Sequence, residues 1–149
     1  MNDTVRVLLA AAAVSLAAVA TLAWRIARTD PAGPERLIGE LRLAQWAAVL
    51  LAGVGAVPIG LAVARVTDAT GNFDVALGVV FVGVAGIVLQ REPREGLLIV
   101  AGGFVVHALV DIAHRPGWLS SELAPRWFTV GCAVYNVCLA GICYWARRR

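Results

Sequence analysis

Five long apolar runs constrain the fold of this chain more than any other feature of its sequence. They cover about residues 5–24, 43–64, 75–90, 96–113 and 127–145. Each run is near the length that an α-helix needs to cross about 30 Å of hydrocarbon. Because a backbone in lipid must satisfy its own hydrogen bonds, such runs are expected to be helical. The sequence therefore predicts one all-α domain over residues 1–149, an integral membrane bundle of five transmembrane helices.

The composition agrees with a chain surrounded by lipid bilayer. Hydrophobic residues make up 60% of the sequence and charged residues only 15%, and the mean hydropathy is +0.77. A soluble domain of this length needs more polar surface. The net charge is +3, but the arginines flank apolar runs as topology signals do, so no nucleic-acid partner is expected.

Two features mark the ends of the runs. The segment "REPRE" (91–95) places two Arg, two Glu and a Pro between the third and fourth runs. This favours a tight helical hairpin over one long helix. Tryptophan prefers the two membrane interfaces, and all five tryptophans lie at or just beyond the ends of runs: Trp24, Trp46, Trp118, Trp127 and Trp145.

The distribution of arginine predicts the orientation, because cytoplasmic segments are enriched in basic residues. With the N-terminus outside, the inner segments hold nine arginines, at positions 25, 28, 36, 42, 91, 94, 147, 148 and 149. The outer segments hold four, at positions 6, 65, 115 and 126. We therefore predict a multi-pass protein of a bacterial inner membrane, with an outer N-terminus and a cytoplasmic C-terminus.

The first run has a second interpretation as a signal peptide, which would leave four helices. Its leader "MNDTVR" has one Arg and one Asp, so it lacks a basic segment, and the run exceeds the usual apolar region of roughly 7–15 residues. Cleavage would also place the four arginines of residues 25–42 outside. We therefore expect the first span to be retained.

An ionisable ladder interrupts the fourth run. At 100° per residue, Asp111 lies about 40° to one side of His107 and His114 about 20° to the other, so the three share one helix face. In the predicted orientation they lie in the outer half of the membrane, and Tyr135 and Asn136 of the fifth run reach a similar depth. The inner half is expected to be plainer, with Gln45, Gln90 and Glu40 near its border.

Such a cluster can be structural, because intramembrane ionisable residues face the bundle interior and need partners. It can also be a site. Two imidazoles and a carboxylate are ligands of divalent metals, and an ion held by two of His107, Asp111 and His114 could take another ligand from Asp68 or Asp74. Without metal, Asp111 could orient one histidine as a general acid or base. His107, Asp111, Tyr135 and Asn136 are then the candidate catalytic residues.

The stretch "HALVDIAHRPG", followed by "APRWFTVGCAVYN", resembles small, uncharacterised bacterial families of polytopic membrane proteins. These carry an H-x-x-W-D-x-x-H segment and a later P-x-W near the last span. The resemblance covers residues 107–136. It departs from the pattern at Val110, where Trp is usual, and at Asn136, where an acid is expected. It implies an architecture and the location of a site, and no particular activity.

Three functions remain open from the sequence. The first is a membrane enzyme acting on an apolar substrate such as an isoprenoid, a quinone or a lipid, by acid–base or metal chemistry. The second is a non-catalytic subunit that binds a membrane-protein partner through the small residues of its spans. The third is a transporter that works as a homo-oligomer. The three cysteines at 132, 138 and 143 are expected to be small buried residues without disulfides.

Overall fold

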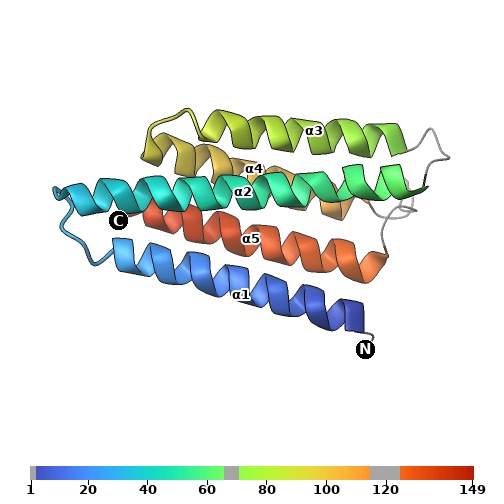
Figure 1. Cartoon of the computed structure of the whole chain (residues 1–149), viewed down its shortest axis with the longest axis horizontal. Helices are drawn as coiled ribbons and strands as arrows, with labels where there is room; N and C mark the ends of the chain where they lie inside the picture. The colour runs from blue at the N-terminus through green and yellow to red at the C-terminus, as the bar shows by residue number, and fades with distance from the viewer. Residues whose placement is uncertain (1–2, 66–70, 115–124) are drawn as a thin grey trace.

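A computed structural model describes residues 3–65, 71–114 and 125–149, and these residues are almost entirely helical (Figure 1). Five helices follow one another: α1 (Asp3–Ile26), α2 (Pro34–Arg65), α3 (Gly71–Val88), α4 (Pro93–Ala113) and α5 (Arg126–Arg148). Each contains most or all of one apolar run. The prediction of an all-α bundle of five helices is confirmed.

The helices run side by side and alternate in direction (Figure 1). We call the two ends of the bundle after the chain termini that they carry. The C-terminal end also holds the α1–α2 connection (27–33) and the tight α3–α4 connection (89–92). Pro93 occupies the first turn of α4, where its missing N–H is not needed. At the N-terminal end α2 and α4 finish, and α3 and α5 begin.

Within the described residues, four helical segments are long and apolar enough to cross a membrane, and Phe73–Val88 is a shorter apolar helix. Large hydrophobic side chains cover the outside of the bundle, including Val14, Val80, Leu109 and Val134. In water this surface would be a severe aggregation liability, whereas in lipid it is the expected one. The chain is a membrane protein with four to five spanning helices.

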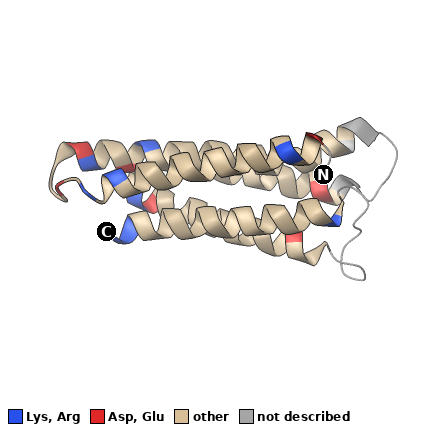
Figure 2. Cartoon of the chain, turned by 90° about the horizontal axis from the view of Figure 1, so that it is seen from below, with Lys and Arg blue, Asp and Glu red and all other residues tan. Residues whose placement is uncertain are grey.

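The charged residues gather at the two ends (Figure 2). The C-terminal end carries most of them, including Arg25, Arg91, Arg94 and the terminal arginines. Guanidinium groups there lie over aromatic rings, with Arg28 3.8 Å from the centroid of Trp24. Between the ends the ribbon carries few charged residues (Figure 2).

The core is built from close helix contacts through small residues. A Cβ added to Gly78 of α3 would collide with the carbonyl oxygen of Gly55 on α2, so these two helices touch backbone to backbone. A Cβ on Gly103 of α4 would lie 2.7 Å from Leu51 Cδ2. Among the described helices, α1 contacts only α2 and α5. In the apolar membrane-crossing part of α1, 11% of the residues are buried, against 44% for α4.

Helix α2 begins nine residues before the predicted apolar run. Its added first turns carry buried charged residues, which corrects the expectation that the inner half of the bundle has few polar groups. Glu40 is buried and accepts a hydrogen bond from Arg36 Nε at 2.9 Å. Arg94 Nε of α4 lies 3.1 Å from Glu40 Oε2. The spacing of Arg36 and Glu40 by one helical turn joins the two charges, so the polar start of α2 can enter the core.

Candidate functional site

A cavity of about 60 Å³, measured for the centres of water-sized molecules, lies among α2, α3, α4 and α5 in the half of the bundle nearer its N-terminal end. Five of its residues carry ionisable side chains: Asp74, His107, Asp111, His114 and Cys132. Most of the remaining wall is apolar, from Val54, Val57, Pro58, Leu61, Leu77, Gly78, Phe81, Val110 and Phe128. The cavity has room for a few water molecules at about 10–15 Å³ each.

The deeper part of the polar wall is a pair from α4. His107 Nδ1 lies 3.1 Å from Asp111 Oδ2, and the two side chains are 6% and 12% exposed. Their separation of four residues places them on one face, as the sequence predicted. The Phe81 ring of α3 lies against the imidazole, with 4.6 Å between centroids.

Asn136 of α5 completes this group and is fully buried. Its amide nitrogen donates to the carbonyl oxygen of Cys132 at 2.9 Å and to Asp111 Oδ2 at 3.3 Å. It also lies 3.1 Å from His107 Nδ1 and 3.3 Å from Cys132 Sγ. Because a backbone carbonyl can only accept, these contacts fix which amide atom is the nitrogen. Asn136 Oδ1 has no hydrogen-bond partner among the described residues.

Asp111 and Asn136 make opposite demands on His107 Nδ1. A carboxylate 3.1 Å away favours a hydrogen on that nitrogen, whereas an amide N–H at 3.1 Å favours a lone pair there. If one proton moves between Asp111 and His107, Nδ1 carries a hydrogen in one state and a lone pair in the other, so each contact is satisfied in one of the two states. The hydrogen on His107 Nδ1 is therefore coupled to the proton held by Asp111.

His114 forms a separate pair with another helix. Its Nε2 lies 2.8 Å from Asp74 Oδ1 in the first turn of α3, and its Nδ1 lies 2.7 Å from the carbonyl oxygen of Val110. The side chains of His114 and Asp74 are 14% and 9% exposed. Thus the three ionisable residues predicted on one face of α4 form two separate pairs, His107–Asp111 and Asp74–His114, and both pairs line one cavity.

The structure assigns the remaining predicted residues different surroundings. Tyr135 turns away from His107, and its hydroxyl lies 2.8 Å from Ser15 Oγ on α1. Asn136, its neighbour, points into the site. Asp74 partners His114. Asp68 and Trp118 lie outside the described residues.

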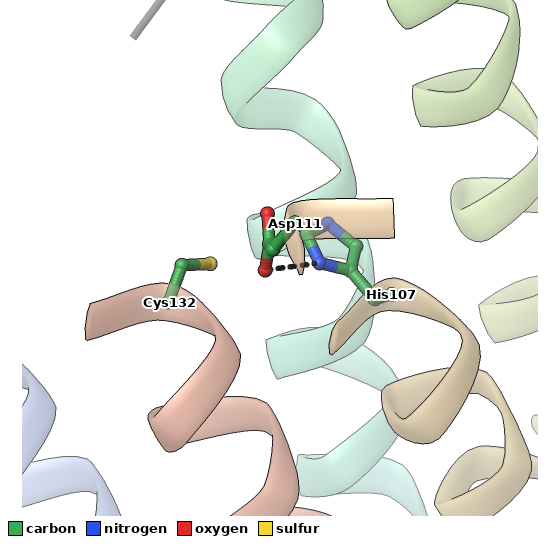
Figure 3. A group of neighbouring side chains, drawn as sticks. All are labelled: His107, Asp111 and Cys132. Atoms are coloured by element: carbon green, nitrogen blue, oxygen red, sulfur yellow. Dashed lines mark hydrogen bonds and ion pairs between the residues drawn. The ribbon is translucent and has the colours of Figure 1, made fainter. Parts of the chain in front are cut away.

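Among the described residues, one group of potential metal ligands forms. His107, Asp111 and Cys132 place one ligand atom each within 4.8 Å of one another (Figure 3). Figure 3 shows the Cys132 sulfur directed from α5 toward the Asp111 carboxylate on α4. The Asn136 amide nitrogen already contacts Nδ1, Oδ2 and Sγ of these residues. Its N–H groups supply the positive partial charge that an ion would otherwise supply.

Sequence reasoning missed Cys132 and the pairing of Asp74 with His114. Cys132 precedes Asn136 by one helical turn, so the two share a face of α5. That spacing was an available signal. The pairing across α3 and α4 had none, because run order does not determine which spans touch.

Comparisons with family models, curated proteins and solved structures give no match for this chain. The resemblance of residues 107–136 to small bacterial membrane-protein families therefore stays a prediction.

Proposed function

We propose that this protein is a membrane enzyme that acts on an apolar substrate whose reacting polar group enters the cavity, with the His107–Asp111 pair as its acid–base group. One observation carries the proposal: ionisable side chains from α3, α4 and α5 converge on an otherwise apolar cavity inside the bundle. Apolar pockets with a few convergent polar groups are typical of small-molecule sites. Buried ionisable residues in a membrane bundle also favour a functional interpretation over a structural one.

The residues divide the work as follows. Apolar side chains of α2 and α3 would bind the hydrocarbon part of an isoprenoid, a quinone or a lipid, and exclude bulk water from it. Asp111 would hold the proton that His107 gains or releases, and Asn136 would fix the orientation of both. His107 would exchange that proton with a polar group of the substrate.

The charges of the bundle support an orientation for this site. Arginines are concentrated at the C-terminal end (Figure 2), which the positive-inside rule places in the cytoplasm. We propose that the protein lies in a bacterial inner membrane with its N-terminus outside. The cavity then lies in the outer half of the bilayer.

A metal-dependent version is the second candidate, because His107, Asp111 and Cys132 can offer three ligand atoms. Nitrogen, oxygen and sulfur ligands together suit zinc. An ion there would have to displace the Asn136 contacts. Elemental analysis of purified protein tests it: we expect less than stoichiometric metal, whereas one equivalent that Cys132→Ser removes would establish the metal-dependent version instead.

Ligand binding tests the first candidate directly. We expect farnesol, a short-chain quinone or oleic acid to raise the thermal stability of the purified protein, because a ligand at 100 times its Kd adds about 2.7 kcal/mol. His107→Gln and Asp111→Asn should weaken this stabilisation. Tyr135→Phe is the matched control, since its hydroxyl faces Ser15 on α1.

Two results would contradict the proposal. One is that no member of the three ligand classes stabilises the protein. The other is that both site variants, still folded, keep the full response to a ligand that stabilises the wild type.

A further inference from the structure

The surroundings of His114 determine how many protons this part of the cavity holds. The carbonyl oxygen of Val110, 2.7 Å from Nδ1, can only accept, so Nδ1 carries a hydrogen. The opposite nitrogen, Nε2, lies 2.8 Å from Asp74 Oδ1. A hydrogen bond there needs one more proton, on Nε2 or on the carboxyl group. The Asp74–His114 pair therefore holds one proton more than a neutral imidazole and a carboxylate.

This pair and the His107–Asp111 pair lie at different depths of one cavity. His114 caps α4 at the N-terminal end of the bundle, and Asp74 lies in the first turn of α3. Along the axis of α4, Asp111 lies three residues, or about 4.5 Å, deeper in the bundle than His114. His107 lies seven residues, or about 10 Å, deeper than His114. Water in the cavity can bridge such distances.

Every helix around the cavity contributes a known set of ionisable groups. The α3 wall supplies Asp74, the α4 wall supplies His107, Asp111 and His114, and the α5 wall supplies Cys132. The α2 wall supplies only apolar side chains. No described arginine lines the cavity, so the two carboxyl groups, the two imidazoles and the Cys132 thiol determine its charge.

Toward the C-terminal end the polar wall stops. From His107 toward the C-terminal end, the described core contains fully buried apolar residues, among them Leu51, Val100, Phe104 and Leu139. The next buried charges along this direction are Arg36 and Glu40, near the far end. In the described part of the chain, a proton in the cavity thus has carboxyl and imidazole partners toward the N-terminal end only.

We infer that the Asp74–His114 pair is the proton entry of this site, open to the N-terminal end of the bundle and closed to the other. The pair releases its extra proton to cavity water, which delivers it to Asp111 or His107. The neutral imidazole and carboxylate that remain take up a proton from water at that end. This inference deepens the proposed acid–base function and rests on it.

The chain has only two histidines, which allows a direct test. Protein labelled with ¹⁵N-histidine in lipid nanodiscs gives one imidazole spectrum for His107 and one for His114. We expect His114 Nδ1 to carry a hydrogen, and Asp74→Asn to change the His114 spectrum. We also expect hydrogen exchange at His107 to slow about tenfold or more in Asp74→Asn and in His114→Gln, because a positioned acid–base group speeds proton transfer by about 10²–10⁴.

The matched control is Arg94→Gln at the opposite end, which should leave exchange at His107 unchanged. Wild-type exchange rates at His107 in both folded variants would overturn the inference. So would proton flux through proteoliposomes above that of protein-free vesicles, since a one-sided route conducts no protons across the membrane. These measurements use ligand-free protein, so they can fail or succeed independently of the ligand-binding experiment.

Discussion

The two polar clusters of this bundle differ in whether their charged side chains line the cavity. At the C-terminal end, Glu40 accepts hydrogen bonds from Arg36 and Arg94 and joins α2 to α4, and no charged residue of this cluster lines the cavity. Near the N-terminal end, two histidine–aspartate pairs line the cavity. This difference favours a structural role for the Arg36–Glu40–Arg94 cluster and the proposed acid–base role for the cavity cluster.

Among the described residues, each cluster contains one buried polar atom without a hydrogen bond: Arg36 Nη2 at the C-terminal end and Asn136 Oδ1 beside the cavity. For Arg36, the remaining nitrogens bind Glu40 and the carbonyl oxygen of Ile26 at the end of α1, so the guanidinium still has two partners. For Asn136, the amide nitrogen is crowded by four groups while its oxygen has none. An unpaired buried polar group costs about 1–3 kcal/mol.

The largest expected effect is that of Glu40→Ala. Removal of one partner of a buried ion pair typically costs about 3–5 kcal/mol, because the Arg36 charge is left buried. We expect a loss of this size in the free energy of unfolding, measured in mixed micelles. The spectra of His107 and His114 in the folded fraction should stay as in the wild type. A stable Glu40→Ala protein with altered histidine spectra would reverse the roles of the two clusters.

The next largest effect concerns the backbone contact beside the cavity. Gly78→Ala places a Cβ against the Gly55 carbonyl, and overpacking of this kind costs about 1–3 kcal/mol. Gly83→Ala on the same helix is the control, since a Cβ there meets nothing within 4 Å. It should leave stability equal or slightly higher, since Ala is the better helix former. Thermal unfolding in detergent measures both.

The surface of α3 at Gly83 also tests the non-catalytic alternative. Gly83→Leu should fit without harm to the isolated protein, because the space beyond this residue is open within the chain. If the protein serves a membrane-protein partner through this face, Gly83→Leu will abolish co-purification of that partner. Retained co-purification would remove this face from consideration.

A smaller effect is expected for Asn136→Leu. The variant loses a hydrogen bond to Asp111, and it also loses the unpaired Oδ1. Because these effects oppose each other, we expect a loss of stability of only about 1–2 kcal/mol. The His107 spectrum should nevertheless shift toward a hydrogen on Nδ1, because the competing amide donor is gone. An unchanged His107 tautomer would show that Asn136 has no part in setting it.

The smallest effect is expected for Arg94→Gln. The Arg94 side chain is 57% exposed, and exposed ion pairs contribute about 0–1 kcal/mol. The free energy of unfolding should therefore change by less than about 1 kcal/mol, far less than for Glu40→Ala. An equal loss in both variants would mean that Arg94, rather than Arg36, holds the Glu40 charge in the core.

The outcome for particular residues shows how far sequence reasoning extends. His107 and Asp111 were predicted as a pair because helix geometry places residues four apart on one face. Asn136 was predicted to reach the depth of His107, which it does, but Tyr135 shares that depth and faces α1 instead. Depth follows from position along a span, whereas direction depends on how each helix is rotated against its neighbours.

The amino-acid sequence by itself determined the helical class, the number of helices, the position of the α3–α4 turn and the face shared by His107 and Asp111. These follow from local rules, namely the length needed to cross lipid and the periodicity of the helix. Only the tertiary structure decided that His114 joins Asp74, that Cys132 and Asn136 meet His107, and that Glu40 is buried. Those contacts join residues on different helices or depend on helix rotation, and close packing between small residues fixes both.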